Sequence, residues 1–397
     1  MEALVELSNK LLNYCNLSFK RYIAGEIDWS DRLIGIMGMR GAGKTTLMLQ
    51  HLKENYGTGG KALYISLDNV YFSRNSLLDL AGDFAKKGGE ALYVDEVHKY
   101  PDWSVEIKNI YDHYPELKIV FSGSSILELY KGHGDLSRRL SSYTMPSMSF
   151  REFIELEHQI KLPAFTLKDV LTKHTEICHF ICSKIKPIAF FVDYLEFGSL
   201  PFYLDNRSRY HERLHNVISL TLEYDLPSVT PTDYAHIIKI KMLLKIISEQ
   251  VPYKPNITKL AGQTGIDRKT VLKYLDLLAR SGLTMQLSTA SKSDSVFTKP
   301  QKIYLGNPNF MYALCDEKPN AGTLRETFFC NQVSVKNQVN TSEASDFLVG
   351  NTYTFEIGGK NKDTRQLKGI EKAYVAADNL EYGFGNHIPL WLFGFLY

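Results

Sequence analysis

The sequence predicts an α/β protein built on a doubly wound parallel sheet, followed by a helical region and two smaller units. Three observations lead to this fold class. Short runs of apolar residues alternate with helical patterns between residues 30 and 150, a Gly-rich segment follows the first run, and an acidic pair follows the third. Strands separated by helices pair in parallel, and such a sheet binds its ligand at the carboxyl ends of the strands.

Length and composition predict a multidomain globular protein. The chain has 397 residues, 44% of them hydrophobic, which is more than a single core usually serves. Its 46 Lys and Arg residues balance 44 Asp and Glu residues, and the net charge of +2 indicates no global attraction to nucleic acid or to a membrane surface. A nucleic-acid partner would therefore bind through a local surface.

Cysteine usage and the absence of targeting patterns predict a cytoplasmic protein with no membrane partner. The five cysteines are scattered and odd in number, which argues against a disulfide framework. We find no signal-peptide pattern and no apolar run of about 18 residues. His174, Cys178 and Cys182 would share one face of a helix, but buried cysteines usually serve as small apolar residues and paired metal-ligand motifs are absent.

The segment from Gly38 to Thr45 fits the pattern G-x-x-x-x-G-K-[ST] of a phosphate-binding loop. In such a loop the backbone N–H groups face the phosphates, the lysine reaches the β and γ oxygens, and the threonine hydroxyl binds Mg²⁺. The run RLIGIMG before it suits a buried strand and TTLMLQHLKEN after it suits a helix, so the motif has the context that it needs. The predicted nucleotide-binding residues are Gly38, Met39, Arg40, Gly41, Ala42, Gly43, Lys44, Thr45 and Thr46.

The stretch ALYVDEVHKY places an acidic pair at the end of a buried strand, which a Mg²⁺–nucleotide site requires. We predict that Asp95 holds Mg²⁺ together with Thr45, and that Glu96 is the general base that deprotonates the attacking water. Two solvated carboxylates are the alternative. The next strand, LKIVFSGSS, ends in Ser122 and Ser124, which either contact the γ-phosphate or the attacking water, or form a simple turn.

The acidic pair, the strand end FSGSS, the basic segment DLSRRL and the stretch PSMSFREFIEL resemble a group of prokaryotic AAA-type ATPases with a C-terminal region of undefined function. The resemblance implies ATP and Mg²⁺ as cofactors, since nothing here resembles the N-K-x-D motif of GTPases. It also implies that Arg139, or its neighbour Arg138, is an arginine finger or sensor, in cis or in trans within a homo-oligomer. A guanidinium would neutralise charge on the transferred phosphoryl group, whereas a basic surface pair is the alternative.

Residues 236 to 290 predict a winged helix-turn-helix. A strongly apolar helix precedes a helix with Asn256 at its N-cap, a turn at Gly265 and a second helix. Residues 291–299 would form the tip of the wing. Double-stranded DNA is the predicted partner, although a solvated basic face or a protein-contact module would have the same pattern. The residues expected to enter a DNA major groove are Arg268, Lys269 and Lys273.

The C-terminal segment resembles a restriction-endonuclease-like fold, in which carboxylates bind a metal that activates water and neutralises phosphate charge. Where that family has the lysine of an E-x-K motif, this chain has Gly358, although Lys360 or Lys362 lies nearby in the sequence. We therefore expect a degenerate domain retained for binding or assembly, with an active nuclease as the alternative. The acids that match the family's site, in order, are Glu326, Asp346 and Glu356.

Together these patterns predict an Mg²⁺-dependent AAA-type ATPase coupled to a DNA-binding winged helix and a nuclease-like domain. The alternative is a nucleotide-controlled switch that contacts proteins and no DNA. Lys44, Glu96, Arg139 and Ser122 are the predicted catalytic residues. The predicted domains are a helical extension (1–29), the ATPase core (30–150), a helical lid or linker (151–232), the winged helix (233–305) and the endonuclease-like domain (306–397).

Overall fold

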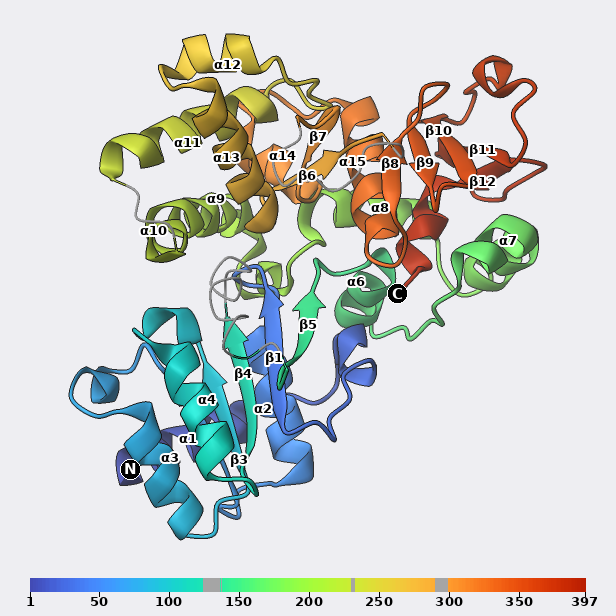
Figure 1. Cartoon of the computed structure of the whole chain (residues 1–397). Helices are drawn as coiled ribbons and strands as arrows, with labels where there is room; N and C mark the ends of the chain where they lie inside the picture. Colours follow the sequence, from blue (N-terminus) through green and yellow to red (C-terminus); the bar gives the residue numbers. More distant parts are fainter. Residues whose placement is uncertain (124–135, 137, 230–232, 290–298) are drawn as a thin grey trace. The chain divides into compact units, whose positions relative to one another are not determined.

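The computed structural model describes the whole chain except residues 124–135, 137, 230–232 and 290–298 (Figure 1). The chain forms two compact units. The first contains Met1–Pro146 and Leu220–Thr232, and the second contains Ser147–Ser219 and Asp233–Tyr397. None of the helices described combines the length and the apolar character that a membrane crossing requires.

The first unit alternates helices and strands along the chain. Its elements are α1 (Glu2–Tyr14), η1 (Tyr22–Gly25), β1 (Leu33–Gly38), α2 (Lys44–Asn55), β2 (Ala62–Ser66), η2 (Val70–Ser73), α3 (Leu77–Lys86), β3 (Ala91–Asp95), η3 (Val97–Lys99), α4 (Trp103–His113), β4 (Lys118–Gly123), β5 (Ser141–Met145), η6 (Thr221–Asp225) and α10 (Leu226–Val229).

These strands form the parallel sheet that the sequence predicts. The strand order is β2-β3-β4-β1-β5, and every neighbouring pair runs parallel. The four expected strands are β1 to β4. The fifth, β5, was not expected, because its polar residues alternate between partly buried and exposed positions at the edge of the sheet, where only β1 pairs with it. All carboxyl ends therefore meet at one edge.

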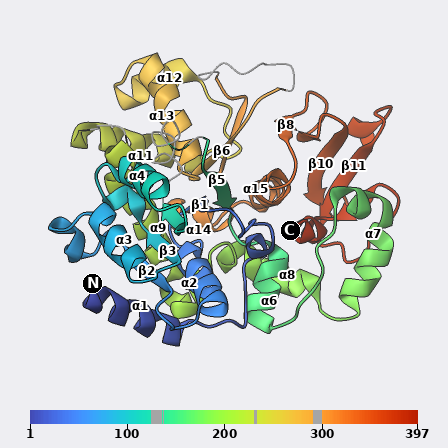
Figure 2. The same cartoon turned by 60° about the horizontal axis from the view of Figure 1, so that its bottom comes forward.

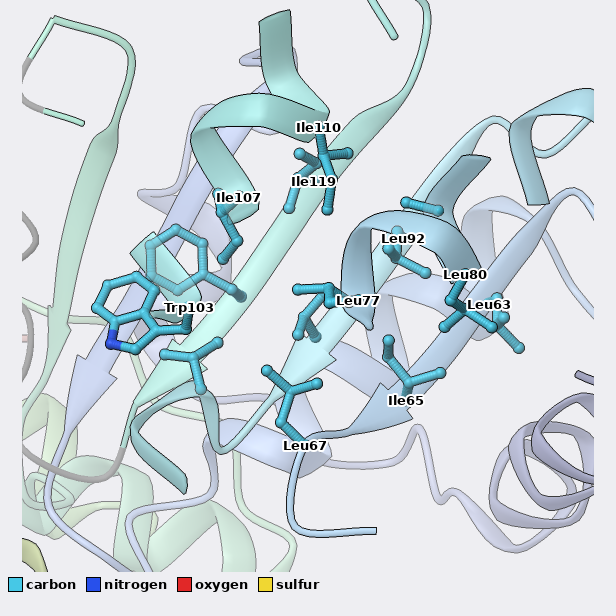
Figure 3. Close-up of a cluster of buried hydrophobic side chains, with 14 of the residues drawn as sticks. Leu63, Ile65, Leu67, Leu77, Leu80, Leu92, Trp103, Ile107, Ile110 and Ile119 are labelled. Carbon is cyan, nitrogen blue, oxygen red and sulfur yellow. The ribbon is translucent and has the colours of Figure 1, made fainter. Parts of the chain in front are cut away.

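Helices cover both faces of this sheet. On one face, α3 and α4 bury apolar side chains against alternate residues of β2, β3 and β4, as expected for a strand period of two (Figure 3). On the other, α2 packs against β1 to β4, and α1 lies beside α2 (Figure 2). The side chains labelled in Figure 3, on the face covered by α3 and α4, are Leu63, Ile65, Leu67, Leu77, Leu80, Leu92, Trp103, Ile107, Ile110 and Ile119.

The second unit begins with helices and ends with a sheet. Its elements are α6 (Phe150–His158), α7 (Leu167–Cys182), α8 (Pro187–Phe197), η4 (Pro201–Asp205), η5 (Arg207–Arg209), α9 (Tyr210–Leu220, whose last residue belongs to the first unit), α11 (Tyr234–Ser248), α12 (Ile257–Thr264), α13 (Arg268–Arg280), β6 (Thr284–Leu287), β7 (Lys302–Leu305), α14 (Asn309–Leu314), α15 (Ala321–Ser334), β8 (Val339–Thr341), β9 (Phe347–Val349), β10 (Tyr353–Gly359), η7 (Arg365–Leu367), β11 (Ala373–Asp378), β12 (His387–Pro389) and η8 (Leu390–Phe395).

The helices and the strand predicted between residues 236 and 290 are present as α11, α12, α13 and β6. Asn256 accepts a hydrogen bond from a backbone N–H in the first turn of α12, and Gly265 ends that helix at φ 64°. Asp267 caps α13 in the same way, and β6 and β7 pair antiparallel. Of the predicted wing tip at residues 291–299, all but the last residue lie outside the described part of the chain.

The C-terminal sheet has the strand order β12-β11-β10-β9-β8. Strands β10, β11 and β12 are parallel, whereas β8 and β9 pair antiparallel to their neighbours. Helix α15 packs against β10. The last residue, Tyr397, accepts hydrogen bonds at its backbone oxygen from Ser149 and Arg151, so the end of the chain is fixed to the start of α6.

The stretch PSMSFREFIEL has a structural role in this unit. Ser149 and Glu152 form a reciprocal capping box at the start of α6, and Phe150 and Phe153 are fully buried. This packing explains the pattern of polar and aromatic residues in the stretch without any contact to a ligand.

The glycine and proline that follow α8 act as helix terminators. Gly198 ends α8, and Pro201 occupies the first position of η4. Helix termination therefore explains both residues, and no hinge is needed to account for them.

Candidate nucleotide site

The loop between β1 and α2 has the backbone that a phosphate-binding loop requires. Gly38, Gly41 and Gly43 have φ angles of 150°, 81° and 99°, a region that favours glycine. A Cβ atom at Gly38 would lie 2.5 Å from the backbone oxygen of Met145, so no larger residue fits there. The N–H groups of this loop and of the first turn of α2, where Thr46 is exposed, lie at a helix N-terminus, a position that suits an anion.

Lys44 lies folded over the loop that it follows. Its Nζ donates to the backbone oxygens of Gly38 at 2.9 Å and Met39 at 3.0 Å, and the residue is 5% exposed. Burial lowers the pKa of this ammonium group, although the charges of Glu96 and Asp95 oppose the shift. Phosphate oxygens can replace the two carbonyl oxygens, because both kinds of acceptor satisfy the same donors.

Asp95 is held at the carboxyl end of β3 by four donors. Its oxygens accept from Thr45 Oγ1 at 2.5 Å, from the Tyr64 hydroxyl at 2.8 Å, from the Glu96 backbone N–H at 3.0 Å and from the Ser122 hydroxyl. Burial, and then the charge of Asp95, raise the pKa of Tyr64 well above its ordinary value, so Tyr64 remains a donor. The adjoining oxygens of Thr45 and Asp95 are hard donors of the kind that Mg²⁺ prefers.

Ser122 contacts Asp95 and is fully buried within β4. Its hydroxyl therefore orients the carboxylate that is expected to serve the metal. Ser122 lies in strand β4 and not in a turn, and its expected contact with the γ-phosphate or the attacking water stays a prediction. Ser124 lies outside the described residues.

Glu96 follows Asp95 with a left-handed backbone, at φ 55° and ψ 41°. A non-glycine residue in this region stores strain, which is typical of functional sites. The Glu96 side chain is 20% exposed, and its Oε2 lies 3.3 Å from His98 Nε2. Glu96 is thus fixed by its neighbours and still open to solvent, as a base that activates water must be.

A third acidic residue approaches the site from a distant part of the chain. Asp225, in η6, accepts from Arg40 NH2 at 2.8 Å, a contact that spans 185 residues of sequence. Its Oδ1 also lies 3.5 Å from His98 Nε2. Burial alone would raise the pKa of Asp225, but hydrogen bonds from His98 and Arg40 and their charges lower it to about 2. Asp225 is therefore a buried anion beside the phosphate-binding loop.

Arg21 stabilises the loop through hydrogen bonds to its backbone. Its guanidinium donates to the backbone oxygens of Ala42 at 2.5 Å and Pro146 at 2.8 Å, and the residue is 4% exposed. Arg21, Tyr64, His98 and Asp225 were all missed by sequence analysis. None of the four belongs to a recognisable sequence motif, so no pattern in the sequence could have identified them.

Arg139 lies at the other edge of the sheet. It precedes β5, whose first residue, Ser141, pairs with Ile34 near the amino end of β1. Its guanidinium donates to both carboxylate oxygens of Asp112, at 3.0 and 3.1 Å. The phosphate-binding loop follows the carboxyl end of β1, so Arg139 does not approach the loop of its own chain.

The three acids predicted in the C-terminal segment converge, together with two lysines. Tyr304 donates to Glu326 at 2.7 Å, and Lys302 lies 4.0 Å from Glu326 and 3.7 Å from Asp346. Burial and then the charge of Asp346 raise the pKa of Glu326, with a smaller contribution from Glu356. Among the described residues, no group of three or more His, Cys, Asp or Glu side chains is arranged to hold a metal ion.

Lys362 occupies the space beside Gly358, the position at which the E-x-K motif has its lysine. A Cβ atom at Gly358 would lie 2.6 Å from Cβ of Lys362, because that side chain lies across the glycine. Lys362 Nζ pairs with Glu356 at 2.6 Å. Of the two lysines that lie nearby in the sequence, Lys362 is therefore the one that contacts this cluster.

The three basic residues predicted to bind DNA are exposed. Arg268, Lys269 and Lys273 lie in the first half of α13, and none forms an ion pair with another described residue. A cavity at the start of α12 and α13 is lined by further cations, Lys254 and Lys299, beside Arg268. The basic surface is therefore larger than the three residues of α13.

Comparison with known protein families agrees with the fold of the first unit. A family of AAA domains matches residues 30–154. These residues carry the fold and motifs of an AAA-type P-loop ATPase. A domain of unknown function (DUF8612) matches residues 189–321, and no curated protein matches the chain.

Solved structures similar to this chain share little sequence with it. The Walker-type ATPase PABY2304 of Pyrococcus abyssi is 15% identical over 75% of this chain and 95% of its own, with a TM-score of 0.46. The ORC1 protein of Aeropyrum pernix in complex with DNA is 12% identical over 80% and 92%, with a TM-score of 0.33. AMPPCP-bound DnaA from Aquifex aeolicus is 15% identical over 68% and 84%, with a TM-score of 0.25.

Proposed function

We propose that this protein is an Mg²⁺-dependent ATPase whose nucleotide cycle controls a DNA-binding winged helix. One observation carries the ATPase part: the Thr45 hydroxyl and the Asp95 carboxylate meet at 2.5 Å beneath the phosphate-binding loop, and Glu96 follows directly. The AAA-domain match favours ATP as the nucleotide. Thr45 and Asp95 would hold Mg²⁺, which would neutralise charge on the phosphates.

Each residue then has a separate task in hydrolysis. The loop N–H groups and Lys44 bind phosphate oxygens. Thr45 and Asp95 hold the metal, and Tyr64 and Ser122 keep Asp95 oriented. Glu96 orients water for attack on the γ-phosphate and accepts its proton.

The DNA-binding part rests on the exposed cations of α13 and on the adjacent cations Lys254 and Lys299. Helix α13 would enter a major groove with its first half. We expect double-stranded DNA to raise the rate of ATP turnover at low salt, and DNA affinity to fall steeply as salt increases. Replacing Arg268, Lys269 and Lys273 by alanine should make the DNA affinity less dependent on salt. The slope of log affinity against log salt should fall by about one for each phosphate contact that is lost.

ATP turnover and DNA binding should be measured together across a salt series, with Lys161→Ala as the control because Lys161 is exposed on a different segment of the same unit. A turnover rate that ignores DNA at low salt, with no detectable binding, would leave the alternative function: a nucleotide-controlled switch that contacts proteins.

We also propose that Arg139 acts in trans, within a homo-oligomer. Its place near the amino end of β1, whereas the loop follows the carboxyl end of β1, supports this over a cis role. Turnover per chain should then rise with protein concentration, and Arg139→Ala should abolish the rise. A flat profile for the parent protein would remove the arginine-finger role.

For the C-terminal domain we propose binding or assembly instead of cleavage. Lysines neutralise the carboxylates of Asp346 and Glu356, so a metal would have to displace Lys362 from Glu356. We expect supercoiled plasmid to remain intact after incubation with Mg²⁺ or Mn²⁺. Cleavage that disappears in Asp346→Ala would instead identify an active nuclease.

A further inference from the structure

One helical run connects the nucleotide site to the chain segment that leads into the predicted winged helix. α9, η6 and α10 follow one another without a break from Tyr210 to Val229. The run enters the first unit at Leu220, and its next turn, Thr221–Asp225, is π-helical. Wide turns of this kind are uncommon and often occur at functional positions. After α10 the chain continues to α11, the first helix of the predicted winged helix.

The last residue of the π-helical turn, Asp225, is the contact between this run and the nucleotide site. Its side chain is fully buried and pairs with Arg40, a residue of the phosphate-binding loop itself. It also lies beside His98, which contacts the predicted base Glu96. The turn is therefore anchored to both parts of the site, the part expected to bind phosphate and the part expected to activate water.

Nucleotide phosphates would compete with Asp225 for Arg40. A guanidinium binds phosphate oxygens with several strong, charge-assisted hydrogen bonds. Arg40 has an unused hydrogen-bond donor, because its Nε is buried and has no hydrogen-bond partner in the described structure. If Arg40 turns to the phosphates, the buried carboxylate of Asp225 loses the charge of the guanidinium, which is unfavourable. The π-helical turn must then rearrange, or Asp225 must bind more closely to His98.

We propose that Asp225 is a positioning residue that detects an occupied phosphate-binding loop: it loses Arg40 to the nucleotide, and the turn Thr221–Asp225 changes conformation in response. This inference rests on the proposed nucleotide binding. The released Asp225 draws His98 toward itself, because one ring nitrogen of His98 lies between Asp225 and Glu96 at 3.5 and 3.3 Å. Glu96 is then free to orient water. Nucleotide binding and the winged-helix connection are thereby coupled through one buried carboxylate.

The test uses Asp225→Asn, which keeps the side chain's size and removes its charge. The full-length variant should bind Mg²⁺–AMPPNP about fivefold or more tightly than the parent in calorimetry, because Arg40 no longer has a competing anion. At saturating ATP it should also hydrolyse ATP more slowly, because His98 remains in contact with Glu96. In an Arg40→Gln background, Asp225→Asn should leave the affinity unchanged. Glu90→Gln removes a surface ion pair with Lys61 and serves as the matched control, with no change in affinity.

Hydrogen exchange gives an independent measurement. In the parent, backbone amides of Thr221–Val229 should exchange faster when Mg²⁺–AMPPNP is added, and in Arg40→Gln they should exchange fast with or without it. Since the Arg40 side chain is partly exposed, this variant tests the inference even if Asp225→Asn does not fold. An unchanged affinity in Asp225→Asn, an equal effect in the Arg40→Gln background, or an exchange rate that ignores the nucleotide would overturn the inference. A parent protein that binds no nucleotide would overturn the proposed function instead.

Discussion

Glu96→Gln should lower kcat for ATP hydrolysis by about 10²- to 10⁴-fold and leave nucleotide binding intact. Glutamine matches glutamate in size and can still accept a hydrogen bond from water, but it cannot take the proton. The side chain is 20% exposed and sits outside the contacts that hold Asp95, so the metal ligands should not move. Single-turnover hydrolysis and calorimetric affinity, measured on the same preparation, separate the two effects.

The control for Glu96→Gln is Glu54→Gln. Glu54 pairs with Lys20 on the surface of the same unit, so the change makes the same chemical replacement away from the site. Glu54→Gln should turn over ATP at the parental rate. Equal turnover in Glu96→Gln and the parent would show that another group activates the water.

The parts of the site that lie close together in the sequence could be predicted from it. The strand β1, the glycine-rich loop and α2 are consecutive, so residue spacing alone specifies where Lys44 and Thr45 lie. The acidic pair was equally accessible, because Asp95 ends a strand whose apolar residues are all buried. Parallel strands bring both segments to the same edge of the sheet, and that rule needs no coordinates.

The supporting residues could not be predicted, because their roles arise from tertiary packing. Tyr64 reaches Asp95 only because β2 pairs with β3. Asp225 contacts Arg40 because the segment after α9 belongs to the first unit, although its sequence resembles an ordinary boundary. No local pattern distinguishes these side chains from surface residues of the same type. Their burial, which the sequence does not encode locally, gives them their function.

The C-terminal cluster illustrates the same limit. The resemblance to a restriction-endonuclease-like fold, whose acids Glu326, Asp346 and Glu356 match in order, was enough to suggest that they converge. The sequence could not say which lysine replaces the one missing at Gly358. That choice depends on the turn after β10, which lays Lys362 across the glycine.

Lys44→Ala should weaken ATP binding by roughly 10- to 100-fold, because it removes charged hydrogen bonds to the phosphates. The weakening has two sources. The ammonium group is buried, so no solvent-borne cation can replace it, and its removal leaves the oxygens of Gly38 and Met39 without their donor. The loop is therefore deprived of both a ligand-binding group and its internal support, and turnover should fall with binding, unlike in Glu96→Gln.

Thermal unfolding provides the simplest measurement of this difference. A ligand that binds only the folded state raises Tm, so excess Mg²⁺–ATP should stabilise the parent and Glu96→Gln but leave Lys44→Ala almost unchanged. Lys61→Ala, which alters an exposed lysine of the same unit, should behave like the parent. If Lys44→Ala keeps its affinity and its nucleotide-dependent rise in Tm, the phosphates lie elsewhere, and the roles assigned to Thr45, Asp95 and Asp225 lose their common basis.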